Sequence, residues 1–324
     1  MLFRSFYYHE GDNPLHEKSR IDALCEQHSL PLNGYRFISG NTQANNIENF
    51  IYFPDHELFY WRNGVVWNNQ PQPGCEAHLR PRTHNFTALS RVHKWWRATV
   101  MCYLQREGLL DNSYWSYNTI DMGDQYCDNP IELWSFNIEN DLHNFVAGAP
   151  YTCDTLNATE HNSHWTLVRE HYEDSYCNLV LETFFDADGS NGAFISEKTF
   201  KPIRHAQPFV IFGTPGTLAT LRSLGYRTFD HAIDNTYDTI ENNDLRTQAV
   251  VKQLAWYCSL SDKEKTDVMH AVEPIVLHNF HHFYSEFRHI ITRELLDNTK
   301  TVYKNLEYHD NHINYNNIYH VLTS

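Results

Sequence analysis

Two short segments carry charged side chains in patterns that suit the binding of an anion. In the first, residues 89–97 (LSRVHKWWR), Ser90 stands where a strand should give way to a helix, and Arg91 and Lys94 follow it. Cations in the first turn of a helix oppose the helix dipole, so they are badly placed for stability alone. They are well placed if a phosphate or diphosphate binds at the same helix start. The alternative is a solvated basic turn without a ligand.

The second segment, residues 182–201, combines a carboxylate at a strand end with a capped helix start. Glu182 is expected to end its strand, and after a polar loop Ser196 opens a helix in which Glu197 and Lys198 come first. The N–H groups of a helix start, with a lysine beside them, would hold a phosphate, while a carboxylate suits the hydroxyls of a ribose. An ordinary capped helix with a Glu–Lys surface pair is the alternative.

The elements that must position these segments alternate between strand and helix. Hydrophobic periodicity and turn residues predict strands at 2–8, 35–39, 50–53 running on to 58–61, 85–90, 114–118, 177–185, 208–213 and 226–229. They predict helices at 21–28, 91–108, 196–206 and 214–225, and a largely helical tail from 238. Such alternation is typical of an open, mostly parallel α/β sheet, where ligands bind outside the carboxyl ends of the strands. Both charged segments are predicted to lie there.

A loop-rich stretch divides the chain. Residues 63–85 are rich in Asn, Gln, Pro and Gly, which is typical of a loop between periodic segments. The length of 324 residues suits two domains. We therefore predict one α/β domain over 1–80 and a second over 81–275, followed by a helical tail over 276–324. Residues 119–165, rich in Asp, Asn and aromatic side chains, are predicted to be irregular and are candidates for stacking on a sugar.

Composition argues against several classes of function. The chain holds 25 Lys and Arg against 40 Asp and Glu, a formal net charge of −15, so we do not expect it to bind duplex nucleic acid. Its seven cysteines are scattered without a CxxC pair, which favours reduced thiols and a cytoplasmic location. No apolar run reaches the length of a membrane span. GxSxG, GxGxxG and the P-loop pattern are absent, so those enzyme classes have no support in the sequence.

The order of the motifs resembles a known enzyme family. A strand ending in Ser-Arg before a helix, a strand with Glu182 at its end, ISEK at 195–198 and PFVIFG at 208–213 follow one another as in the donor domain of the fucosyltransferase-type glycosyltransferases. That family has two Rossmann-like domains facing a central cleft, the GT-B arrangement. The resemblance implies a GT-B-like α/β fold in which 1–80 binds the acceptor and 81–275 the donor. The C-terminal helices would pack back across both domains.

The resemblance also implies a reaction and its site. A nucleotide-diphosphate sugar, linked to GDP or UDP, would transfer its sugar with inversion to a hydroxyl of a glycan or other acceptor, without a metal. Carried over by position, Arg91 and Lys198 would hold the diphosphate and Glu197 the ribose, while Glu182 would shape the nucleotide pocket. The expected donor-binding residues are Ser90, Arg91, Lys94, Glu182, Ser196, Glu197 and Lys198.

In such a reaction a carboxylate of the N-terminal domain would be the general base that deprotonates the acceptor. Candidates that follow predicted strands are Glu10, Asp12, Asp55, His56 and Glu57. Glu57 and Asp55 are favoured because the aromatic residues 59–61 beside them could stack on a sugar. Glu10 is retained as a third candidate.

Two further patterns could bind metals. Asp186 and Asp188 form a DxD motif that could hold Mg²⁺ or Mn²⁺ on a diphosphate, although DADGSNG is also an ordinary turn composition. His278, His281 and His282 have helical spacing, but no flanking Cys or Asp completes a zinc site, so packing is favoured.

Two rival functions stay open from the sequence. The first is a non-catalytic carbohydrate-binding protein, because aromatic residues make up 15% of the chain. The second is a glycosyltransferase that acts on modified nucleic-acid bases, which the acidic balance disfavours.

Overall fold

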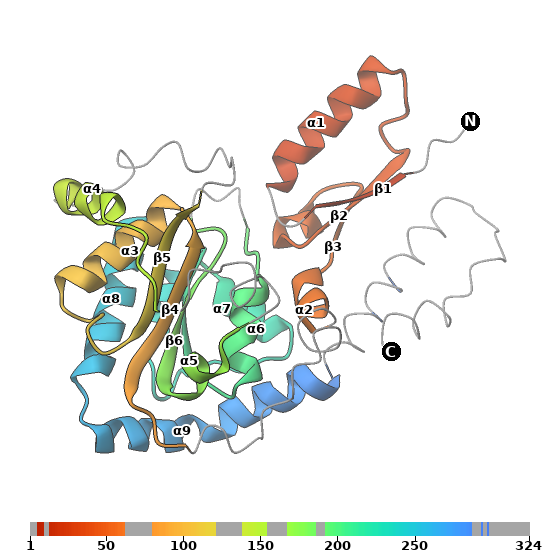
Figure 1. Cartoon of the computed structure of the whole chain (residues 1–324). Coiled ribbons are helices and arrows are strands. Elements are labelled where there is room, and N and C mark those ends of the chain that lie inside the picture. The colour runs from red at the N-terminus through yellow and green to blue at the C-terminus, as the bar shows by residue number, and fades with distance from the viewer. Residues whose placement is uncertain are drawn as a thin grey trace.

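Seven strands in the described part of the chain form two separate parallel sheets (Figure 1). The computed structural model describes residues 5–9, 13–61, 80–120, 138–153, 167–185 and 192–286, with isolated helical positions at 293 and 297. The chain is therefore an α/β protein, as the alternation of its elements predicts. Among the helices described, none combines the length and the apolar composition needed to cross a bilayer.

The first sheet lies near the N-terminus and has the strand order β1-β2-β3. Its strands are β1 (Ser5–His9), β2 (Tyr35–Ser39) and β3 (Phe50–Tyr52), connected through α1 (Pro14–Gln27) and the 3-10 helix η1 (Thr42–Asn46). Asn13 accepts a hydrogen bond from the N–H of Leu15, and Pro14 supplies a helical φ, so α1 begins at Pro14. The small core of this sheet consists of Cys25, Tyr35, Phe37, Ala44, Ile47 and Phe50.

The second sheet has the order β5-β4-β6-β7 and carries the main hydrophobic core. Its strands are β4 (His84–Val92), β5 (Tyr114–Ile120), β6 (Ser175–Leu181) and β7 (Phe209–Phe212). Every residue of β6 and β7 is buried, as expected of parallel strands covered on both faces. Figure 1 shows α3 (Trp95–Arg106) and α8 (Asn243–Ser259) on one side of this sheet, and α6 (Glu197–Arg204) and α7 (Thr217–Ser223) on the other.

The connections of the second sheet leave its centre in opposite directions. β4 leads through α3 to β5 on one side, whereas β6 leads through α6 to β7 on the other. Because β4 and β6 are paired neighbours, the strand order reverses between them. In an open α/β sheet such a switch point, at the carboxyl ends of the strands, is where ligands bind.

Helix α2 (Asp55–Tyr60) follows the first sheet and packs against α6 of the second. Figure 1 shows it between the two sheets. The ring of Tyr60 on α2 is fully buried, 6.1 Å from the ring of Phe283, which in turn lies 6.1 Å from Phe200 on α6. Residue 283 belongs to a π-helix (His282–Glu286), so this part of the C-terminal tail contacts both α2 and α6.

Helix α9 (Asp262–His281) leads into that π-helix along the lower edge of Figure 1. It begins at a capping box formed by Ser261 and Glu264, and Lys265 donates to Asn85 Oδ1 on β4 at 2.8 Å. α9 continues through residue 275, where the sequence predicted a domain boundary. The other described elements are α4 (Glu139–Ala147), α5 (Arg169–Glu173) and η5 (Thr236–Thr239).

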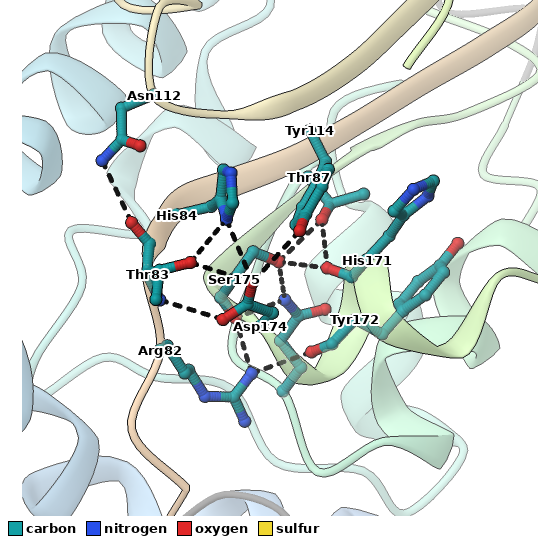
Figure 2. A network of polar contacts seen from close by, with 11 residues as sticks. Arg82, Thr83, His84, Thr87, Asn112, Tyr114, His171, Tyr172, Asp174 and Ser175 are labelled. Atoms are coloured by element: carbon teal, nitrogen blue, oxygen red, sulfur yellow. Dashed lines mark hydrogen bonds and ion pairs between the residues drawn. The ribbon is translucent and has the colours of Figure 1, made fainter. Parts of the chain in front are cut away.

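A buried polar network ties the amino ends of β4 and β6 to α5 (Figure 2). The guanidinium of Arg82 donates to the carbonyl oxygens of Tyr172 at 2.8 Å and Ser175 at 2.6 Å. Thr87 Oγ1 donates to the carbonyl oxygen of His171 at 2.6 Å. These bonds satisfy carbonyl groups that would otherwise be costly to bury. They therefore hold in place the strands whose opposite ends form the switch point.

Several sequence predictions of local structure are wrong. The helix expected from residue 91 begins at Trp95, because β4 continues to Val92 and pairs there with Ile120 of β5. Residues 58–60 lie in α2 and not in a strand. Residues 226–229 form no strand, since the N–H and C=O of Arg227 bond to the side chain of Asn279. Helix α4 lies within the stretch 119–165 that was predicted to be irregular.

Candidate functional site

The switch point between β4 and β6 brings the two predicted segments together, although Ser90 does not cap the helix that follows. Ser90 lies within β4, is 2% exposed and donates to the carbonyl oxygen of Val92 at 3.3 Å, so it does not cap α3. Lys94 is the N-cap residue of α3 without a side-chain cap bond. Its ammonium lies 5.5 Å from the ring centroid of Trp96, and the residue is 3% exposed.

Arg97, which the sequence did not single out, joins α3 to the end of β6. Its Nε and Nη2 donate to the carbonyl oxygen of Glu182 at 3.2 and 2.8 Å, and the residue is 3% exposed. A buried guanidinium needs such acceptors for its several N–H groups. Arg97 thus fixes the backbone at Glu182 from the β4 side of the switch point. Arg97 lies in the first turn of α3, and nothing in the sequence marked it as a contact of Glu182.

Glu182 follows β6 directly, as predicted, and its carboxylate organises the start of α6. It accepts from Ser196 Oγ at 2.6 Å, from Thr199 Oγ1 at 2.6 Å and from the Ser196 N–H at 3.2 Å. Ser196 is the N-cap of α6 and accepts from the N–H of Lys198 at 3.4 Å, which confirms the predicted helix start. Glu182 is 1% exposed. A carboxylate therefore already accepts the hydrogen bonds of the first residue at this helix start.

Three cations lie around this helix start. Lys198 Nζ contacts Glu197 Oε1 at 3.1 Å, Ser196 Oγ at 3.2 Å and Thr183 Oγ1 at 3.4 Å. Lys201 lies one turn further along α6. Burial lowers the pKa of Lys201 to about 8; Glu197 opposes this shift, while the positive charges of Lys198 and Arg91 add to it. The positive charges of Arg91 on β4 and of Lys198 on α6 thus both lower the pKa of the Lys201 ammonium group.

Lys201 was not among the predicted site residues. Its signal in the sequence was its spacing, three positions after Lys198, which places both side chains on one side of the helix. Like charges that gather in this way favour a neighbouring anion, and Glu197 supplies one negative group through its contact with Lys198 Nζ and its effect on the pKa of Lys201. Below we call Arg91, Lys198 and Lys201 the basic cluster.

Glu197 links the basic cluster to the N-terminal part of the chain. Its Oε2 lies 3.5 Å from Nδ1 of His56 on α2, and its side chain is 4% exposed. The His56 ring also meets the ring of Phe194 edge to face at 4.9 Å. His56 is 8% exposed. Oε1 of Glu197 thus contacts Lys198, a predicted phosphate-binding residue, and Oε2 of the same carboxylate contacts His56 from α2.

The loop before α6 is also joined to the first sheet. Thr42 N–H donates to the carbonyl oxygen of Ala193 at 3.0 Å, and Ala193 N–H donates to Thr42 Oγ1 at 2.9 Å. Asn41 and Phe194 form an isolated antiparallel bridge. Gly192 has a φ of +57°, and a Cβ on it would lie 2.3 Å from Asn41 Oδ1. Only glycine permits this close approach.

The favoured catalytic candidates lie in different surroundings. Glu57 is 1% exposed and accepts a hydrogen bond from the hydroxyl of Tyr226. Burial raises the pKa of Glu57 well above 4.5, and the bond from Tyr226 only partly opposes this. In this position Glu57 is out of reach of an acceptor hydroxyl. Asp55 is the first residue of α2, whereas Glu10 and Asp12 lie outside the described residues.

Two of the three aromatic residues in 59–61 that were expected to stack on a sugar belong to the core, while the side chain of Phe59 lies outside the described part. Tyr60 is 0% exposed and Trp61 is 9% exposed, and both lie in the main hydrophobic cluster. Their predicted contact with a sugar is therefore wrong for this arrangement, because the ring faces are covered by protein. Most of the other candidate stretch, 121–137 and 154–166, lies outside the described residues.

The two metal patterns have different outcomes. Asp186 and Asp188 lie outside the described residues. His278 Nε2 and His282 Nε2 bond to the carbonyl oxygens of Gly225 at 2.9 Å and Leu224 at 2.7 Å, at the end of α7. This is the packing role that the sequence favoured for the histidines. Within the described ranges, no group of three or more His, Cys, Asp or Glu residues could hold a metal.

Comparisons of the chain with protein family models, with curated proteins and with solved structures find no match. The proposed function therefore rests on the geometry of the switch point between β4 and β6.

Proposed function

We propose that this protein is a glycosyltransferase that moves a sugar from a nucleotide-diphosphate donor, GDP- or UDP-linked, to an acceptor hydroxyl. The supporting observation is the basic cluster of Arg91, Lys198 and Lys201 at the switch point of a parallel sheet. Cations gathered at this site in a chain of net charge −15 favour the binding of an anionic ligand. A diphosphate supplies two adjacent negative groups.

The same cluster suits the chemistry of transfer. The acceptor oxygen attacks the anomeric carbon, the bond from that carbon to the diphosphate oxygen breaks, and a nucleoside diphosphate leaves. Negative charge grows on the leaving group in the transition state, and preorganised cations stabilise it there. With Arg91 and Lys198 on the diphosphate, inversion at the anomeric carbon needs a base on the opposite side of the sugar. No metal is required for these steps in our proposal.

The two sheets support a finer architectural proposal. We propose that they correspond to the two Rossmann-like halves of a GT-B enzyme, with 1–80 on the acceptor side, 81–275 on the donor side and 276–324 as a helical tail. Contacts of His56 with Glu197 and of Thr42 with Ala193 bring the N-terminal part to the basic cluster. An acceptor held by the N-terminal part would thereby meet a donor held by the other half.

A thermal-shift screen of GDP, UDP, CMP and dTDP tests this function. Selective stabilisation by one nucleotide is expected, and a ligand at 100 times its Kd adds about 2.7 kcal/mol to the free energy of unfolding. Inorganic pyrophosphate serves as the control that separates nucleotide recognition from simple anion binding. If no nucleotide raises the Tm of the folded protein, the transferase proposal fails. Sugar binding without any nucleotide response would instead support a carbohydrate-binding protein.

A further inference from the structure

One residue of the N-terminal part bonds to both backbone groups of Ala193, in the loop before α6. The N–H of Thr42 donates to the carbonyl oxygen of Ala193 at 3.0 Å, and the N–H of Ala193 donates to Thr42 Oγ1 at 2.9 Å. Thr42 is the first residue of η1, which follows β2, so it lies beyond the carboxyl end of a strand of the first sheet. Below we call this pair of hydrogen bonds the Thr42 clasp.

The Thr42 clasp lies among buried residues. Ala193 is buried, as are Asn41 and Phe194, which form the antiparallel bridge beside the clasp. Gly192 approaches Asn41 so closely that a Cβ on it would clash with the Asn41 side chain. A buried N–H group without an acceptor is costly, so a methyl group cannot replace the hydroxyl of Thr42 without loss.

The clasp is close along the chain to the basic cluster. Three residue steps lead from Ala193 to Ser196, the N-cap of α6, and a chain of that length reaches about 11 Å at most. Ser196 Oγ in turn accepts from Nζ of Lys198 at 3.2 Å and from the N–H of the same residue at 3.4 Å. A shift of Ala193 is therefore passed on to the lysine that we propose for the diphosphate.

The start of α6 thus has one anchor in each part of the chain. On the side of the second sheet, the carboxylate of Glu182 accepts hydrogen bonds from the hydroxyl and the N–H of Ser196. On the side of the first sheet, Thr42 holds Ala193. Glu182 fixes Ser196 itself, whereas the clasp fixes the path by which the chain enters the helix. Loss of either anchor should therefore loosen this helix start.

We infer that Thr42 is a positioning residue of the proposed donor site, and that it acts on Lys198 through Ala193 and Ser196. This inference rests on the proposed function. A preorganised cation binds a diphosphate more tightly than a mobile one, because less conformational freedom is lost on binding. Donor affinity should therefore depend on a hydroxyl in the part of the chain that we propose for the acceptor. Because coupling between sites is reciprocal, a bound donor should in turn stabilise the Thr42 clasp.

Three substitutions separate this role from a general contribution to stability. Thr42→Val removes the hydroxyl at nearly the same shape and leaves the N–H of Ala193 without its acceptor, whereas Thr42→Ser keeps the hydroxyl. Thr87→Val is the matched control, because the hydroxyl of Thr87 also bonds to the backbone of a distant segment, at the carbonyl oxygen of His171. That bond lies at the amino ends of the strands, opposite the switch point (Figure 2).

Calorimetry measures the Kd of the nucleotide that the thermal-shift screen selects, and urea unfolding measures the stability of each variant. Thr42→Val should weaken nucleotide binding about fivefold or more, which is the lower end of ordinary coupling between two sites. Thr42→Ser should restore the wild-type Kd. Thr87→Val should unfold at a lower urea concentration than the wild type but bind the nucleotide normally, because its hydroxyl bonds at the other end of the sheet.

Hydrogen exchange of the wild-type protein gives a second test that needs no variant. Saturating nucleotide should slow amide exchange at 192–198, next to the basic cluster, and also at 41–46, which the clasp joins to it. Slower exchange in both segments means that the ligand stabilises the Thr42 clasp. If exchange slows at 192–198 alone, the two segments are not coupled and the inference is wrong.

The outcomes separate this inference from the proposed function. If no nucleotide stabilises the wild-type protein, the proposed function fails, and the inference fails with it. If the wild type binds a nucleotide and Thr42→Val binds it with the same Kd, only the inference is overturned. An equal loss of affinity in Thr87→Val would also overturn it, since the effect would then follow general stability. Should Thr42→Val fail to fold, hydrogen exchange in the wild type decides.

Discussion

The hydroxyl of Tyr226, which follows α7, donates a hydrogen bond to the carboxyl group of Glu57 on α2, and both residues are buried. Glu57 is 1% exposed and Tyr226 is 2% exposed. Burial raises the pKa of both groups well above their ordinary values. This buried hydrogen bond fastens α2, the helix that carries His56, to the second half of the protein.

The first prediction follows from the sign of this pKa shift. The folded state keeps the proton of Glu57 at pH values where the unfolded chain has lost it. Its contribution to stability is thus complete below about pH 4.5 and is lost as the pH rises toward the raised pKa. Glu57→Gln removes the ionisation at similar shape and should raise stability at neutral pH. Urea unfolding from pH 4.5 to 8 measures this, and an unchanged pH slope in the variant would contradict it.

The second prediction concerns the predicted diphosphate cations. Arg91→Ala and Lys198→Ala should each weaken binding of the nucleotide found in the screen by about tenfold or more, since each loses a charge-assisted contact. Lys263→Ala, on the exposed surface of α9, is the charge-matched control and should bind normally. Calorimetry gives the three Kd values. Full affinity in both site variants, with intact folding, would place the diphosphate elsewhere.

The third prediction concerns Lys201 and pH. Because its pKa is lowered to about 8, mainly by burial, the side chain loses its charge at mildly alkaline pH. A bound diphosphate favours the charged form, so nucleotide affinity should fall as the pH rises through about 8, and binding there should take up a proton. Lys201→Arg keeps the charge and should flatten the profile. Calorimetry in buffers of different ionisation enthalpy measures how many protons are taken up on nucleotide binding. A nucleotide affinity of the wild type that stays constant up to pH 9.5 would refute the role of Lys201 in binding.

The fourth prediction concerns Glu182 and the start of α6. Glu182→Ala removes the acceptor of the Ser196 and Thr199 hydroxyls and of the Ser196 N–H, all of them buried. We expect a loss of about 3 kcal/mol in the free energy of unfolding, because hydrogen bonds to a charged group are the costly ones to break. Glu182→Gln keeps one carbonyl oxygen and should lose less. Urea denaturation ranks the two variants, and equal losses would contradict the expectation that the retained carbonyl oxygen preserves part of this bonding.

The fifth prediction concerns acid stability and His205. His205 is 2% exposed, and its ring stacks on that of Tyr172 with a distance of 5.4 Å between the ring centroids. Burial lowers the pKa of His205 to about 4, and Glu173 opposes this shift. Below pH 6.5 the unfolded chain binds a proton that the folded state excludes, so stability should fall as the pH drops from 6.5 to about 4. His205→Phe keeps an aromatic ring against Tyr172 and should reduce this fall. The midpoint of urea unfolding at pH 4.5 and 7 measures the difference, with exposed His231→Gln as the control.

Local sequence determined the elements whose causes lie within a few residues. The strand at Tyr35–Ser39 follows from its alternation, and the buried strand Phe209–Phe212 from its continuous apolar run. The start of α6 follows from the cap formed by Ser196, which bonds two positions ahead. The alternation of these elements was enough to predict an α/β chain with parallel sheets.

Tertiary structure decided which charged residues meet, because contacts between distant segments leave no periodic signal in the sequence. Arg91 stays in β4 since β5 extends the ladder beside it, and it joins Lys198 only because β4 and β6 are neighbours. Glu57 and His56 are adjacent in sequence, yet on α2 one turns to Tyr226 in the core and the other to Glu197. A helix sends neighbouring side chains in different directions, so only the packing of α2 could assign their roles.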